Sequence, residues 1–209
     1  DGTFLLTKVN ESPVITLFLY YVLPRSFTTF CFQYLCNKVN YVVRKSLENA
    51  VQMEYKALTD DMTGAYNKNR LIELLNNRER DGQDIAVIYW DVNQLKYVND
   101  NWGHLCGDRL ITEVAKSIQS IAREEDIVIR YGGDEFLLYV ANGTKEIAEQ
   151  LIEAWKVRLE EEKKRENYEF PVSASVGYAL GKHSQLKDII VAADKDMYAN
   201  KRIRRESAK

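Results

Sequence analysis

Apolar and polar positions alternate along residues 59–209 in a pattern of short strands and amphipathic helices. Residues 85–90 are apolar at every position, which is expected of a central strand covered on both faces. Three more strands are predicted at 127–129, 136–140 and 172–180. Helical spacing predicts four helices, at 68–78, 108–121, 144–159 and 184–197. This order of elements predicts an α/β (α+β) sandwich, with a central, mostly antiparallel sheet flanked by helices.

Residues 1–58 follow a different pattern and are predicted to form a separate N-terminal part. Residues 4–9 and 14–22 are predicted as two strands joined by a polar turn. Ser26 is predicted as the N-cap of a long helix without proline or glycine, which runs to about Leu58. Two strands followed by such a helix resemble the C-terminal end of a GAF-type sensor domain.

The long N-terminal helix carries a heptad seam, in which residues are spaced alternately three and four apart with one polar member. The seam consists of Cys36, Val39, Val43, Ser46, Ala50, Met53 and Ala57. It predicts pairing with a second helix, whereas a single amphipathic helix packed on its own domain would give the same spacing. Both interpretations stay open from sequence.

Composition narrows the classes of function. The 209 residues fit one ordinary domain with an appendage, and the formal charge of −2 argues against nucleic-acid binding. The three cysteines (Cys31, Cys36 and Cys106) lack the spacing of a metal site and predict reduced thiols in a cytoplasmic protein. Residues 14–23 are apolar but fall short of the ~20 residues that span a bilayer. The missing initiator Met predicts a piece of a longer chain, whose association with a membrane stays open.

Candidate chemistry gathers where two predicted strands end. Gly132 and Gly133 predict a tight hairpin turn, because glycines allow positive φ and leave space for a ligand, and Asp134 and Glu135 follow them. Asp91 closes the buried strand at the end where α/β proteins tend to place ligands. Each acid alone is typical of a solvated turn or a strand end. Together, and with no lysine close to Asp134 and Glu135 in the sequence, they suit a divalent cation.

Four separated motifs resemble the GGDEF domain, the catalytic domain of diguanylate cyclases. They lie, in this order, at residues 61–67, 91–108, 132–136 and 194–201. The resemblance runs from about Asp60 to Arg205, within a predicted catalytic domain at 59–209, and implies a polymerase-palm-like, nucleotide-cyclase-like fold. It also implies condensation of two GTP into cyclic di-GMP plus pyrophosphate, with residues 1–58 as a truncated sensor remnant and signalling helix.

The resemblance assigns the acids to metal binding and catalysis. Two Mg²⁺ (or Mn²⁺) ions per active site would be held by Asp91, the carbonyl of Val92 and Asp134, since Mg²⁺ prefers hard oxygen donors. With Asp134, Glu135 would be catalytic, either as a further metal ligand or in deprotonating the attacking hydroxyl. Asn93 stands where many relatives carry an acid, which lowers the local negative charge.

The resemblance also assigns six residues to GTP. Lys201 and Arg205 would hold the β- and γ-phosphates with Lys96 assisting, Asn99 and Asp108 would bind guanine, and His104 would lie near the nucleoside. An acceptor at Asp108 suits the N1 and N2 hydrogens of guanine and speaks against adenine. Taken singly, Lys96 and His104 are equally typical of surface residues.

One domain holds one GTP, so the product requires two domains that face each other in a homodimer, and the heptad seam is the candidate for that pairing. Arg123 and Asp126 match the family's Arg-x-x-Asp inhibitory site, which predicts inhibition by the product cyclic di-GMP; a local ion pair is the alternative. Two other functions are weighed: a catalytically silent receptor for GTP or cyclic di-GMP, and a cyclase for mixed purine dinucleotides.

Overall fold

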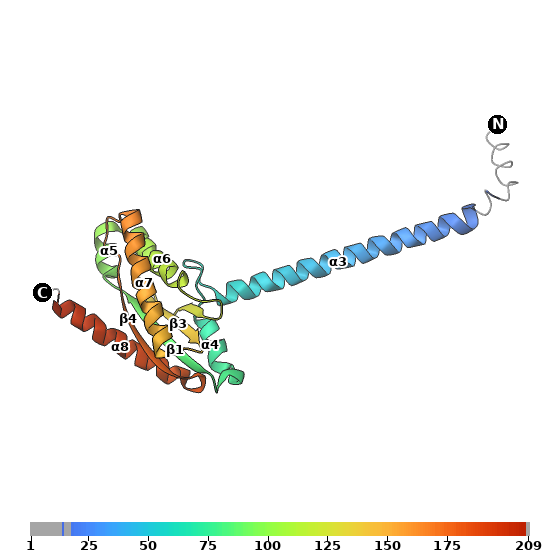
Figure 1. Ribbon diagram of the computed structural model, residues 1–209. Coiled ribbons are helices and arrows are strands. Elements are labelled where there is room, and N and C mark those ends of the chain that lie inside the picture. The colour runs from blue at the N-terminus through green and yellow to red at the C-terminus, as the bar shows by residue number, and fades with distance from the viewer. Residues whose placement is uncertain (1–13, 15–17, 208–209) are drawn as a thin grey trace. The chain divides into compact units, whose positions relative to one another are not determined.

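The computed structural model describes Val14 and residues 18–207 (Figure 1). The chain divides into two compact units between Glu54 and Tyr55. Among the described residues, no helix is both long and apolar enough to cross a membrane.

The N-terminal unit is helical where the sequence predicted a strand. Phe18–Val22 forms a π-helical turn, η1, and continues directly into the long helix α3, Leu23–Leu58. The strand predicted at 14–22 is therefore wrong over residues 18–22. Pro24 is the second residue of α3, and the helical backbone runs through it without a break.

Two further predictions concern this unit. Ser26 is not an N-cap, because it lies inside the helical run and its hydroxyl donates to the carbonyl of Val22 (2.8 Å). The strand predicted at 4–9 lies outside the described residues. The resemblance to a GAF-type end thus loses part of one of the two strands on which it depended. None of the residues of α3 is buried, so its seam faces solvent.

The second unit is built on a four-stranded antiparallel sheet of order β2-β3-β1-β4. The strands are β1 (Asp84–Val92), β2 (Ile127–Arg130), β3 (Glu135–Ala141) and β4 (Ala174–Lys182). All four lie close to their predicted positions. The α+β class and the antiparallel sheet are confirmed.

Helices cover both faces of the sheet (Figure 1). They are α4 (Lys68–Asn76), α5 (Leu95–Trp102), α6 (His104–Gln119), α7 (Lys145–Glu166) and α8 (Leu186–Ser207), with the 3₁₀ turns η2 (Arg78–Arg80) and η3 (His183–Gln185). Thr144 caps α7 as predicted, accepting from Ile147 N–H (3.3 Å). Ser184 does not cap α8, since it lies within η3.

The sequence pattern missed α5 and the first turn of α6, because their polar residues mask the helical period. A single buried residue, Val98, anchors α5. Gly103, with φ +85°, separates the two helices in a conformation that L side chains rarely adopt. The polar residues between 95 and 107 therefore lie on the helices α5 and α6.

β1 is the centre of the fold, because successive side chains enter opposite cores. Ile88 and Trp90 lie in the core beneath α5, α6 and α7, whereas Val87 and Tyr89 lie in the core beneath α4 and α8. This alternation explains why residues 85–90 are apolar at every position. Asp84 at the start of β1 is exposed and Asp91 near its end is partly open to solvent, whereas the residues between them are buried.

Gly177 allows α8 to lie directly on β4. A Cβ atom there would stand 2.0 Å from the backbone nitrogen of Met197. We expect Gly177→Ala to lower the free energy of unfolding by about 3 kcal/mol, since helix and strand would have to separate. Gly82→Ala is the matched control, because no atom lies within 4 Å of its Cβ position. Urea unfolding of both variants checks the prediction, and equal effects would contradict it.

Candidate active site

Strand pairing brings the candidate acids to one end of the sheet. Asp91 on β1 lies directly opposite Glu135 on β3 in the antiparallel register. The next residue, Val92, donates its N–H to the carbonyl of Asp134 (2.9 Å). Because directly opposed residues point to the same face of a sheet, Asp91 and Glu135 share the face that α8 covers. Two segments more than forty residues apart are thus joined by backbone hydrogen bonds.

Lys201 completes this group from α8. Its ammonium group pairs with the Asp91 carboxylate, and the two side chains are only 17% and 19% exposed. Local sequence did not reveal this lysine, because Lys201 lies over a hundred residues after Asp91. Helix α8 follows β4 along the chain and packs on the face of the sheet to which Asp91 points, which brings Lys201 close to it. Asp91 therefore has a cationic partner that local sequence did not reveal.

Tyr89 is a site residue that the sequence pattern missed. Its hydroxyl donates to Oε1 of Glu135 (2.8 Å), although the residue is only 2% exposed. Burial and then the neighbouring Glu135 carboxylate raise the pKa of Tyr89 well above 10.0, so the hydroxyl stays a donor. Within an apolar strand, Tyr89 looked like a core residue. One feature of the sequence does indicate this role. Tyr89 lies two residues before Asp91 in the same strand, so both side chains point to the same face of the sheet.

The glycine turn connects the antiparallel strands β2 and β3 as predicted, but without the positive φ that glycine allows. It comprises residues 131–134, with Tyr131 N–H donating to the carbonyl of Glu135 (2.8 Å), and neither Gly132 nor Gly133 has positive φ. Gly132 is required for space instead, because a Cβ there would lie 2.2 Å from Oε2 of Glu135. A Cβ on Gly133 would meet no atom within 4 Å, which leaves open space beside that backbone.

Arg130 connects the glycine turn to Asp60, which directly precedes the first GGDEF-like motif at residues 61–67. Its guanidinium donates to Oδ1 of Asp60 (3.0 Å) and to the carbonyl of Gly133 (2.6 Å). Asp60 also accepts from the N–H and hydroxyl of Thr63 (3.0 and 2.7 Å). Burial alone would raise the pKa of Asp60, but these hydrogen bonds outweigh it and bring the pKa below 3.8. Arg130 and Asp60 were not among the predicted site residues.

The candidate guanine-binding residues lie on α5 and α6. Asn99 packs against Gly107, where a Cβ would stand 1.9 Å from its Oδ1, and that oxygen is buried without a hydrogen-bond partner. Asp108 follows Gly107 on α6 and is exposed. Lys96 and His104 are exposed on the same two helices, whereas the side chain of Arg205 lies outside the described part of α8.

Asn93 fastens the end of β1 to the segment that leads into β4. Its backbone N–H donates to the carbonyl of Ser173 (2.9 Å), and its Oδ1 accepts from the Ser175 hydroxyl (2.9 Å). An amide therefore has a bonding role here, where an acid would repel Asp91. Because its backbone N–H is already bonded to Ser173, Asn93 does not offer a free backbone amide to a phosphate.

Arg123 and Asp126 form a tight local pair. The guanidinium donates to both carboxylate oxygens (2.9 and 2.8 Å) and to the carbonyl of Ala141 (2.8 Å) at the end of β3. The hydrogen bond to Asp126 raises the pKa of Arg123. The Asp126 side chain is fully buried, whereas that of Arg123 is 32% exposed. This geometry supports the local ion pair, and it leaves Arg123 as the only reachable member.

The candidate acids carry the kind of ligand atom, a carboxylate oxygen, that a hard divalent cation such as Mg²⁺ prefers. Asp91 and Glu135 supply carboxylate oxygens on one face of the sheet, and Asp134 precedes Glu135 in the turn. Mg²⁺ commonly takes one or two carboxylates plus phosphate and water. Within the described residues, no three acidic, histidine or cysteine side chains already form a metal cluster. A cation at this end of the sheet would take its remaining oxygen ligands from water or a ligand.

Comparison with known protein families matches residues 57–207 to "Diguanylate cyclase, GGDEF domain". The chain belongs to the GGDEF family. Probable diguanylate cyclase DgcJ of Escherichia coli (strain K12) is 34% identical over 167 residues, which are 74% of this chain and 33% of that protein. Diguanylate cyclase VdcA of Vibrio cholerae serotype O1 is 32% identical over 124 residues, 59% of this chain and 37% of that protein. The chain thus spans about a third of the length of these relatives.

Solved structures of GGDEF domains have the same fold as this chain. The coiled coil and GGDEF domain of DgcB from Caulobacter crescentus, in complex with c-di-GMP, matches with a TM-score of 0.68 and 26% identity. The match covers 82% of this chain and 94% of that one. The predicted family and fold class are therefore confirmed.

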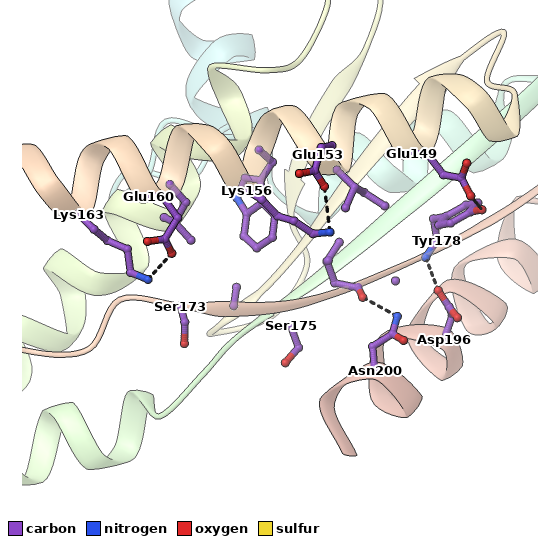
Figure 2. A pocket seen from close by; sticks show the side chains of 16 residues that line it. Glu149, Glu153, Lys156, Glu160, Lys163, Ser173, Ser175, Tyr178, Asp196 and Asn200 are labelled. Carbon is purple, nitrogen blue, oxygen red and sulfur yellow. Dashed lines mark hydrogen bonds and ion pairs between the residues drawn. The ribbon is translucent and has the colours of Figure 1, made fainter. Parts of the chain in front are cut away.

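A cavity of about 690 Å³ in the GGDEF domain lies apart from the acid cluster, between α7, β4 and α8 (Figure 2). Side chains of α8 close the outer edge of β4 there: Asp196 accepts from Tyr178 N–H (3.0 Å) and Asn200 donates to the carbonyl of Val176 (3.0 Å). Such bonds keep an edge strand from pairing with other chains. None of the acids predicted to be catalytic lines this cavity.

The hydrogen bonds that Asp60 accepts predict how the stability of the GGDEF domain depends on pH. Asp60→Asn should lower the free energy of unfolding at pH 7 by about 1–2 kcal/mol, since it weakens charged hydrogen bonds. The difference from the native chain should shrink below pH 3.8, because stabilisation by a carboxyl with a lowered pKa is lost as the pH falls through that pKa. Urea unfolding between pH 7 and 3 measures it, with the exposed Asp61→Asn as control. A difference that does not depend on pH would contradict the assignment.

Proposed function

We propose that this chain is a diguanylate cyclase, which condenses two GTP into cyclic di-GMP and pyrophosphate. One observation carries the proposal: the end of β1, the glycine turn and α8 bring Asp91, Glu135 and Lys201 together. Relatives named as diguanylate cyclases support the same conclusion. A plain surface turn would not need three distant segments to converge.

The residues at this end of the sheet would bind the triphosphate and its cations. Asp91, Asp134 and the carbonyl of Val92 would hold two Mg²⁺ or Mn²⁺ ions. When bound, such ions neutralise the charge that develops on the hydroxyl, phosphoryl and pyrophosphate oxygens. Lys201 compensates Asp91 in the structure, and its ammonium, with Arg205 and Lys96, would bind phosphate oxygens.

Glu135 would act on the attacking 3′-hydroxyl or serve as a further ligand. Tyr89 occupies its Oε1, so Oε2 beside Gly132 is the oxygen left for either task. The hydrogen bond fixes the carboxylate by a buried group and thus orients it before the nucleotide arrives. Tyr89 is in this sense a positioning residue.

Asn99 and Asp108 would bind the guanine base, with His104 near the nucleoside. The buried Oδ1 of Asn99 lacks a partner in the free protein, and burying an unpaired acceptor is costly. A purine that donates to this region would relieve that cost. The Asp108 carboxylate suits the two N–H groups of guanine and favours it over adenine.

Two such domains would have to meet, because each holds one GTP and both phosphodiester bonds of the product join the two nucleotides. The exposed seam of α3 is the proposed means of pairing. An N-terminal input that changes this pairing would then regulate the cyclase.

A silent receptor for GTP or cyclic di-GMP is the second candidate. The ion pair between Lys201 and Asp91 favours it, since it engages a proposed metal ligand. Some relatives also carry other names, such as Cyclic di-GMP phosphodiesterase PdeR of Escherichia coli (strain K12), 34% identical over 149 residues. The presence of Asp134, Glu135 and Lys201 speaks for the cyclase.

Product analysis separates these functions. The purified chain with Mg²⁺ and GTP should yield cyclic di-GMP by mass spectrometry, and ATP should yield no cyclic product. Asp91→Asn and Asp134→Asn should each lower the rate at least a thousandfold, because each removes a charged oxygen donor. The exposed Asp188→Asn on α8 should keep the native rate.

GTP binding without turnover would favour the receptor and contradict the cyclase. Mixed dinucleotides formed from GTP and ATP together would instead contradict guanine selection by Asp108. Native activity in Asp91→Asn would overturn the assignment of the metal ligands.

We also propose product inhibition through Arg123. Truncation to Ala would leave the buried Asp126 carboxylate unpaired and destabilise the fold. Arg123→Lys keeps the charge but loses the two-pronged guanidinium, so the cyclic di-GMP concentration for half inhibition should rise at least tenfold. The exposed Arg158→Lys on α7 is the control. Unchanged inhibition in a folded Arg123→Lys variant would leave Arg123 with only its structural ion pair.

A further inference from the structure

A second apolar surface runs along the N-terminal half of α3 and the turn before it. It consists of Tyr20, Leu23, Phe27, Phe30, Tyr34 and Tyr41, which we call the aromatic stripe. These residues are spaced three, four, three, four and seven apart, so they share one helical face. Each side chain is between 51% and 72% exposed. Large aromatic side chains gathered in this way on a free surface mark an interaction site.

The aromatic stripe lies on the opposite side of the helix from the heptad seam. At about 100° per residue, the centres of the two surfaces are roughly 150° apart around the axis. Pairing of two chains through Val39 and Val43 would therefore leave the stripe exposed. The dimer proposed for catalysis does not account for these aromatic residues.

The charges on the part of the helix that carries the aromatic stripe all have one sign. At about 100° per residue, Lys38 and Lys45 lie on the side of the stripe, whereas Arg25 lies on the opposite side. Between Phe18 and Leu47 the charged residues are Arg25, Lys38, Arg44 and Lys45, and the segment contains no acid. The ammonium groups of Lys38 and Lys45 lie 5.9 Å from the ring centroids of Tyr34 and Tyr41. The stripe thus combines aromatic rings with a row of cations. A second copy on the same face would bring like charges together.

We propose that the aromatic stripe binds the surface of an anionic lipid bilayer. Tyrosine and phenylalanine rings would enter the boundary between headgroups and acyl chains, and the tyrosine hydroxyls would stay hydrated. Lys38, Arg44 and Lys45 would reach the anionic headgroups, to which each basic residue adds attraction. The stripe is roughly 32 Å long, so it offers an extended contact along the membrane plane. In a pair of chains, one helix would rest on the bilayer.

Vesicle flotation of the 209-residue chain tests this proposal. Binding to vesicles of phosphatidylcholine and phosphatidylglycerol (7:3) should be at least tenfold stronger than to phosphatidylcholine alone, and 0.5 M salt should abolish the difference. Phe27→Ser with Phe30→Ser should weaken binding at least tenfold. Val39→Ser with Val43→Ser is the matched control on the seam and should bind within about threefold of the native chain. Circular dichroism verifies that both variants remain helical.

Each alternative result overturns the proposal. Absent binding, equal binding to both vesicles, or native binding by the helical Phe27 and Phe30 variant would remove the lipid partner. If Phe27→Ser with Phe30→Ser changed the oligomeric state in the absence of lipid, the stripe would bind a second copy of this chain instead of a bilayer. Flotation does not depend on cyclase activity, so this result and that of the product analysis stand apart.

Discussion

The antiparallel register between β1 and β3 is the constraint on which the candidate site depends. It sets Asp91 opposite Glu135, and the hydrogen bond from Val92 N–H to the Asp134 carbonyl extends the same pairing into the turn. A slip of one residue would turn these side chains to opposite faces. The register is secured elsewhere, because Ile88 with Leu138 and Trp90 with Phe136 fill one core. Packing of the core therefore positions the chemistry.

Around this register, each polar group near the acids is held by a second residue. Tyr89 fixes one oxygen of Glu135, Gly132 leaves space for the other, and Arg130 joins the turn to Asp60. Lys201 balances Asp91 from α8, the helix that also closes the edge of β4. A site arranged in this way before a ligand binds is suited to stabilising charge that develops during a reaction.

Much of this architecture could be predicted from sequence, because the strands are apolar and bounded by turns. The apolar run at 85–90 and the glycine turn located the acids, and the family resemblance supplied the order of motifs. Three features could not be predicted. Polar residues hid α5, the approach of Lys201 to Asp91 depends on tertiary packing, and Tyr89 resembled a core residue. Conversely, the run at 18–22 has strand-like composition, yet its backbone is helical in continuity with α3.

The central claim is that Asp91 and Asp134 serve the same cations. The most direct measurement is a crystal structure of the chain with Mn²⁺ and a non-hydrolysable GTP analogue, with manganese located by anomalous scattering. The account predicts manganese within about 2.0–2.3 Å of carboxylate oxygens from both residues, with phosphate oxygens completing the coordination. Nucleotide bound with Lys201 still paired to Asp91, and no manganese at either acid, would contradict it.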